Sequence, residues 1–417
     1  MLLCSLEVHM RPITIFRGWS LPGCYAAMLV IGLLMSVYGP IVSVLQGRFG
    51  LSAAAVGAAL GTQSFAAIIG VLIAQPVLRA RGNRWTIMAA MALIAVGGLI
   101  IAAAPTWPLL LVGTAVAGLG FGGVDSMITQ LILVGSGAKG PGRANIAHAW
   151  FGIGTVAGPG LVYLVGPEDY SWIFAGASAL MVLALLGATR LEPRPTPAEV
   201  TTAAHSGDTA PLRRPALFVI AIAAFFALYL THFAVQAGIG NWSPTVLQEQ
   251  SGLPAPTATL FVTGFWAAMV LGRFAAAALA HRVTAGALVT ISSLGLAVAV
   301  AATLLPAAAP WAYMVAGLFL GPIFPTGMAW LTHSGYGRGN SFAYVIAGSM
   351  LGMAFAPSLV GWIIENQGSQ SAPLVLLFIA VLVLVSSAAL VALIARARRI
   401  DASAQLVAAR AGAAVDR

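Results

Sequence analysis

Long apolar runs, each able to cross a lipid bilayer as a helix, divide this chain into twelve segments. A membrane-spanning helix needs about 20 consecutive apolar residues, and runs of that length recur here between short polar breaks. The first six predicted helices cover residues 21–46, 53–76, 84–105, 107–135, 144–166 and 170–189. The second six cover residues 215–240, 257–280, 284–305, 311–333, 341–364 and 371–395. The pattern predicts an all-α membrane protein with twelve transmembrane helices.

Residues 190–214 interrupt the apolar pattern. This segment is rich in Pro, Thr, Ala and charged residues and lacks the periodicity of a membrane helix. It predicts a linker between two six-helix bundles, 21–189 and 215–395, with short tails at 1–20 and 396–417.

Composition agrees with a membrane protein and excludes other classes. Hydrophobic residues make up 60% of the chain and charged residues 7%, whereas charged residues make up about a quarter of soluble domains. The net charge of +9 lies in short loops and tails rather than in a basic run interleaved with aromatics, so nucleic-acid binding is not expected. The sequence contains no metal-binding motif and no catalytic-nucleophile motif. Its match to a dinucleotide-binding motif lies inside a predicted membrane helix, where such a site does not form. We therefore expect no enzyme activity, metal or cofactor.

The basic residues predict which side of the membrane each loop faces. They collect in the tails and in alternate loops, including the linker, whereas the opposite loops hold Arg48 alone. Cytoplasmic loops carry an excess of Lys and Arg. Both termini and the linker are thus predicted to be cytoplasmic, and the protein to be a multi-pass protein of the cell inner (plasma) membrane.

The two halves repeat each other in sequence. Gly154–Val162 (GTVAGPGLV) in the fifth predicted helix matches Gly352–Val360 (GMAFAPSLV) in the eleventh. At nearly the same spacing, Gly118 and Gly122 in the fourth helix match Gly317 and Gly321 in the tenth. Parallel repeats of this kind place a solute site near the membrane midplane, between the halves.

These motifs carry a resemblance to a known family. The Gln46–Ser52 run (QGRFGLS), the pair Gly272-Arg273 followed by His281-Arg282, and Gly321–Thr326 (GPIFPT) resemble the major facilitator superfamily. The resemblance covers nearly the whole chain. It implies a secondary transporter with two pseudo-symmetric bundles and alternating access.

A second resemblance points to one branch of that superfamily. Gly120–Asp125 (GFGGVD), followed by Arg143–Gly154 (RANIAHAWFGIG), resembles the fucose:proton symporter branch of sugar carriers. In that branch an acid on the fourth span takes part in proton coupling, and the matching position here is Asp125. The resemblance therefore implies proton symport of a sugar or a sugar-like compound.

Asp125 also stands out without the resemblance. Of the 11 acidic residues, it alone lies inside a predicted span. A charged carboxylate at the centre of a membrane helix costs about 2.5–3.5 kcal/mol on insertion scales, so such residues are functional by default. We interpret Asp125 as the proton-coupling group. His148, on the adjoining fifth helix, is the natural second titratable group.

A small polar solute needs amide groups for its hydroxyls and an aromatic face for its apolar side. Such residues occur in both halves, and Asn145 and Gln236 are expected to contact the solute. The full candidate set is Tyr38, Gln63, Asn145, Trp150, Gln236, Asn241, Trp242 and Trp266. The expected partners are one solute, protons and the lipid bilayer, with a monomer as the functional unit.

Three alternatives remain open at this stage. The same architecture serves proton-driven efflux of a drug or secondary metabolite, although only the Gly158-Pro159 half of the exporter signature Gly-Pro-x-x-Gly-Gly is present. A transporter-like receptor would need a cytoplasmic effector domain, which the linker and tail do not offer. The single buried acid also leaves facilitated diffusion open.

Overall fold

A computed structural model describes residues 15–136, 140–192, 215–337 and 341–415. Within these ranges, twelve helices are long and apolar enough to span a membrane, as predicted. The first half consists of α1 (Ser20–Phe49), α2 (Ala53–Arg81), α3 (Asn83–Ala103), α4 (Trp107–Gly135), α5 (Gly140–Val165), the short 3-10 helix η2 (Pro167–Asp169) and α6 (Tyr170–Ala188). The second half consists of α8 (Pro215–Ser251), α9 (Ala255–Leu279), α10 (Ala285–Ala302), α11 (Ala309–His333), α12 (Ser341–Gln367), η3 (Ser369–Ser371) and α13 (Ala372–Val415).

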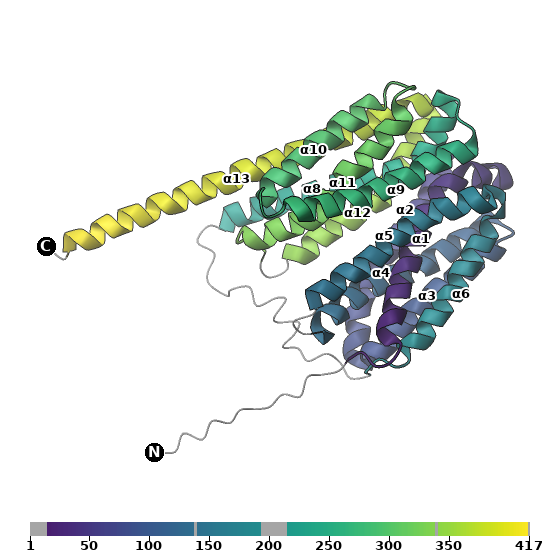
Figure 1. Ribbon diagram of the computed structural model, residues 1–417, viewed down its shortest axis with the longest axis horizontal. Helices are drawn as coiled ribbons and strands as arrows, with labels where there is room; N and C mark the ends of the chain where they lie inside the picture. The colour runs from purple at the N-terminus through teal and green to yellow at the C-terminus, as the bar shows by residue number, and fades with distance from the viewer. Residues whose placement is uncertain (1–14, 137–139, 193–214, 338–340, 416–417) are drawn as a thin grey trace, which may run out of the picture.

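Two helices extend well beyond their predicted ends. Helix α8 continues past Gly240 to Ser251 and contains Pro244. Its added turns are held by tertiary packing, because Trp242, Val246 and Leu247 are buried. Helix α13 continues through the predicted C-terminal tail to Val415, and Figure 1 shows its last turns projecting beyond the other helices. Most of the predicted linker lies outside the described residues.

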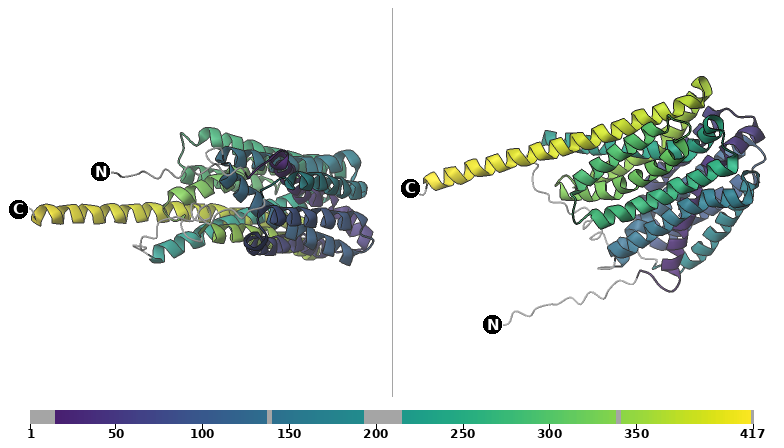
Figure 2. Two further views of the ribbon diagram at one scale, coloured as in Figure 1. Left: turned by 90° about the horizontal axis from the view of Figure 1, so that it is seen from below. Right: turned by 45° about the horizontal axis from the view of Figure 1, so that its top comes forward.

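The helices form two groups that follow the order of the chain. Figure 1 shows α1–α6, in purple to teal, beside α8–α13, in teal-green to yellow, and the right-hand view in Figure 2 also keeps the two groups distinct. Within the first group α1 packs on α5 and α2 on α4, and within the second α8 packs on α12 and α9 on α11. Each pair in one half therefore has its counterpart in the other.

Glycines set the separation of these helix pairs. Gly122 of α4 lies against the Ala67 backbone of α2, and Gly321 of α11 lies against the Met269 backbone of α9. A Cβ atom at either position would collide with the facing carbonyl. Small residues allow such close backbone approach in membranes.

The other repeated glycines act in the same way. Gly154 of α5 lies against Leu29 of α1, and Gly352 of α12 lies against Leu230 of α8. The repeat read from the sequence therefore corresponds to the same contacts in both halves.

The two halves meet on the side where α1 ends and α2 begins. Ala54 N, in the first turn of α2, donates to Glu365 Oε2 of α12 at 3.1 Å. Deeper along the same pair of helices, Ser358 Oγ donates to the Gly57 carbonyl at 3.1 Å, and Gly61 lies against Ala354. In Figure 1 the two groups converge toward this side, here called the closed side.

Two further contacts between the halves agree with this closure. Gly39 of α1 packs on the backbone of Gly240 in α8, and Gly160 of α5 lies nearest to Thr263 of α9. Both pairs lie in the parts of their helices nearer the closed side. Access to the interior is therefore expected from the opposite side, which carries most of the basic loops.

The glycine contacts generate a stability prediction. Gly122→Ala should lower the thermal unfolding temperature, because overpacking of a tight contact costs about 1–3 kcal/mol. Gly47→Ala is the matched control: Gly47 also lies in a membrane helix, α1, but an added Cβ there meets open space. Unfolding of purified protein in detergent measures both variants. Equal unfolding temperatures for Gly122→Ala and Gly47→Ala would show that the close approach of α2 and α4 is not required.

Candidate functional site

The fourth and fifth helices bring together the two titratable residues predicted from the sequence. Asp125 lies on α4 and His148 on α5, and these helices pack against each other. Each side chain is an electrostatic neighbour of the other. Both are partly accessible rather than sealed in the core. A carboxyl group and an imidazole on neighbouring helices can exchange a proton directly or through water.

A second pair of polar groups faces them from the other half. Arg273 on α9 is an electrostatic neighbour of His148, and also of His232 on α8. The packing of α5 on α9 joins the two pairs across the boundary between the halves. Asp125, His148, Arg273 and His232 are together called the charged cluster.

The sequence reasoning missed Arg273 and His232 as site residues. A signal was available for Arg273, since Arg84 stands at the first position of its predicted span and Arg273 is the one Lys or Arg in the interior of a span. His232 carries no comparable signal, because a lone histidine in an apolar helix is common.

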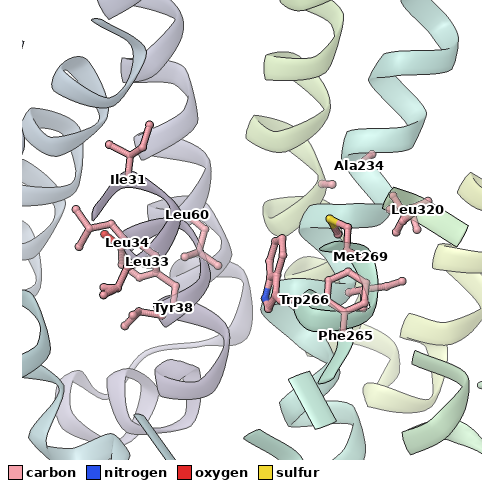
Figure 3. Packing of buried hydrophobic residues seen from close by; sticks show 14 of the residues in the cluster. Ile31, Leu33, Leu34, Tyr38, Leu60, Ala234, Phe265, Trp266, Met269 and Leu320 are labelled. Carbon is pink, nitrogen blue, oxygen red and sulfur yellow. The ribbon is translucent and has the colours of Figure 1, made fainter. Parts of the chain in front are cut away.

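Two of the eight predicted solute residues have buried polar atoms without a hydrogen-bond partner in the described part of the chain. These atoms are Gln63 Oε1 on α2 and Trp266 Nε1 on α9. Buried polar atoms are normally paired, so an unpaired one indicates a strained site or a missing ligand. In Figure 3, Trp266 lies on the side of its group that faces Leu60 and Tyr38 in the first half.

Three other predicted residues are engaged in packing. Tyr38 is buried, and its ring centroid lies 5.5 Å from that of Phe174 in α6. Asn241 Nδ2 donates to the Ala237 carbonyl at 2.8 Å, within α8. Trp242 is fully buried, and its Nε1 donates to the Pro357 carbonyl of α12 at 3.0 Å. The polar groups of Asn241 and Trp242 are therefore already hydrogen-bonded to backbone carbonyls of the second half.

The last three predicted residues differ in exposure. Gln236 of α8 is buried, with 3% of its surface accessible. Asn145 and Trp150, both on α5, are exposed. No three His, Cys, Asp or Glu side chains of the described residues gather as a metal site.

Comparison with known proteins gives a family and a fold. The model of the Major Facilitator Superfamily matches residues 24–341. No match was found among curated protein sequences.

Solved structures of the same architecture include a D-xylose–proton symporter, with a TM-score of 0.72 and 14% identity over 89% of this chain and 96% of that one. The nucleoside transporter NupG gives a TM-score of 0.68 at 14% identity, covering 90% of this chain and 98% of that one. The inward-open form of the xylose transporter XylE from E. coli gives 0.68 at 14% identity, covering 89% and 94%. Identity this low shows the shared fold alone.

The family match covers most of the chain, and the twelve helices have the arrangement of these transporters. The protein is a multi-pass membrane transporter rather than an enzyme, and it belongs to the Major Facilitator Superfamily.

Proposed function

We propose that this protein is a proton symporter that carries a small polar organic solute, such as a sugar or a sugar-like compound, by alternating access. The observation that carries the proposal is the electrostatic pairing of Asp125 on α4 with His148 on the adjacent helix α5. A carboxyl group inside a membrane helix can carry a proton, and an imidazole on the neighbouring helix can supply or accept it. The D-xylose–proton symporter shares this fold, which supports the proposal of proton symport.

The polar character of the solute is supported by the unpaired atoms. Gln63 Oε1 can accept a hydrogen bond from a solute hydroxyl, and Trp266 Nε1 can donate one to a solute oxygen. These two residues come from different halves, so a single chain completes the site and a monomer suffices. The other six predicted solute residues stay predictions.

The direction of access follows from the closed side and the basic loops. Loops on the side opposite to Glu365 carry Arg81, Arg84 and Arg282, among other basic residues. By the positive-inside rule that side is cytoplasmic, as both termini would be. The structure then represents an inward-facing state in the plasma membrane. Rocking of the halves would break the contact between Ala54 and Glu365 and admit solute from outside.

Proton coupling can be tested at Asp125. In proteoliposomes, Asp125→Asn should abolish accumulation of solute driven by a pH gradient, because the amide cannot carry the proton. Exchange of labelled for unlabelled solute without a gradient should continue, because exchange requires no net proton movement. Uptake of labelled sugars from a panel, with and without the gradient, measures both activities.

The matched control for Asp125→Asn is Glu249→Gln, which neutralises an exposed acid near the end of α8. This variant should accumulate solute as the wild type does. If Asp125→Asn also accumulates solute against its gradient, Asp125 is not the coupling group.

The Trp266 N–H can be tested without removing its ring. Trp266→Phe should weaken apparent solute affinity by about fivefold, the usual net worth of one hydrogen bond. Trp311→Phe is the matched control, since Trp311 of α11 is 64% exposed on the outside of the bundle. The concentration dependence of uptake measures both. Unaltered affinity in Trp266→Phe would remove this residue from the solute site.

A further inference from the structure

Arg273 is a cation inside a membrane helix, and it has no carboxylate partner among the described residues. Its Nε is buried and has no hydrogen-bond partner among the described residues. Its Nη2 makes one weak contact, at 3.7 Å, with the Met269 sulfur one turn earlier on α9. The ion pair found in the described part of the chain, Arg17 with Glu192, lies at the surface. An arginine inside a membrane helix is costly, so it normally has a partner or a function.

The groups nearest to Arg273 form no ion pair with it in the described part of the chain. Its electrostatic neighbours are His148 and His232, which can be neutral or cationic but never anionic. The Nδ1 atom of His232 is also buried without a partner. Arg273 and His232 thus present two unsatisfied nitrogen groups in the second half, on adjacent helices α8 and α9. With the His232 proton on Nδ1, both groups are donors, and such a pair suits an anion with two acceptor oxygens.

The position of Arg273 brings such an anion near the proposed solute site. Trp266 lies on the same helix, two turns nearer the closed side, and its unpaired Nε1 belongs to the same half. The guanidinium binds carboxylates through two parallel hydrogen bonds, a geometry that lysine cannot reproduce. A solute that reaches both residues carries its charge at one end and polar or apolar groups at the other.

We propose that the transported solute is a monocarboxylate, such as a sugar acid, whose carboxylate binds the Arg273 guanidinium with His232 beside it. This inference rests on the proposed function and specifies its substrate class. One arginine balances one negative charge, so a monoanion fits the site better than a doubly charged phosphate ester.

The charge balance of the cluster connects anion binding to proton coupling. With Asp125 ionised and both histidines neutral, the cluster formed with Arg273 has no net charge. A bound carboxylate adds one negative charge, which a proton on Asp125 or His148 would offset. Low-dielectric surroundings make the neutral combination strongly preferred. One carboxylate would therefore cross with one proton, without net charge movement.

Matched neutral and acidic sugars test the inference on the purified full-length protein. D-glucose with D-glucuronate, and D-galactose with D-galacturonate, are compared by thermal stabilisation and titration calorimetry. We expect a carboxylate to bind the wild type and its neutral counterpart to bind at least tenfold more weakly. Arg273→Gln should weaken carboxylate binding by tenfold or more, because a charged hydrogen bond is worth more than a neutral one.

Two further variants serve as controls for misfolding. Arg273→Lys keeps the charge but loses the planar fork, so it should bind the carboxylate with intermediate affinity. Arg282→Gln removes an exposed arginine just beyond the end of α9 and should bind as the wild type does. Comparable unfolding temperatures without solute show that the variants are folded.

The inference is overturned if Arg273→Gln binds the carboxylate as tightly as the wild type does. It is also overturned if the neutral sugars bind the wild type at least as well as the acids, or if neither acid binds. Uptake in proteoliposomes separates this result from the proposed function. A neutral sugar accumulated by a pH gradient would refute the carboxylate and leave proton symport intact, whereas carboxylate binding without gradient-driven uptake would refute symport alone.

Discussion

The cost of placing charge in a lipid bilayer governs the organisation of this protein. Nearly all of its charged residues lie in loops and tails, where water and lipid headgroups solvate them. Asp125 and Arg273 are the exceptions, and they lie in opposite halves within one cluster that also contains His148 and His232. Neither residue could persist there without a proton, a neighbour or a ligand to offset its charge. That requirement connects solute and proton at one site.

The helices around the cluster are held by a second constraint, which is close backbone approach. Without a hydrophobic driving force between helices in lipid, small residues and interhelical hydrogen bonds provide the contact. The repeated glycines pack α4 on α2 and α11 on α9 in the same manner. Each half is therefore a compact unit. Between the halves, hydrogen bonds such as those of Ala54 with Glu365 and of Ser358 with Gly57 can separate as the halves rock.

The sequence predicted the fold in detail because its signals are local. The apolar runs locate all twelve spans, and the internal repeat anticipates the paired glycine contacts. The predicted end of α8 was wrong, whereas the predicted last span agrees with the membrane-spanning part of α13, Ser369–Ala397. The burial of Trp242 and Leu247 holds α8 together past Pro244. The polar composition after residue 395 suggested a tail where helix continues.

The candidate site was only partly predictable, because its key features depend on contacts between helices. Asp125 is visible from its position in a span, but the unpaired state of Arg273 is not, since it depends on which side chains of α5 and α8 come near. Trp242 and Trp266 look alike in the sequence. Only their surroundings distinguish them. The Trp242 N–H donates to the Pro357 carbonyl, whereas the Trp266 N–H has no partner in the described structure.

Solute-induced proton movement tests the central claim of proton symport most directly. Purified protein is reconstituted into liposomes that contain a pH-sensitive dye, and a solute that the protein binds is added outside without an imposed gradient. The account predicts that the lumen acidifies as solute enters, and that the acidification is absent in liposomes without protein. Entry of labelled solute with no change in lumenal pH would contradict it and indicate facilitated diffusion.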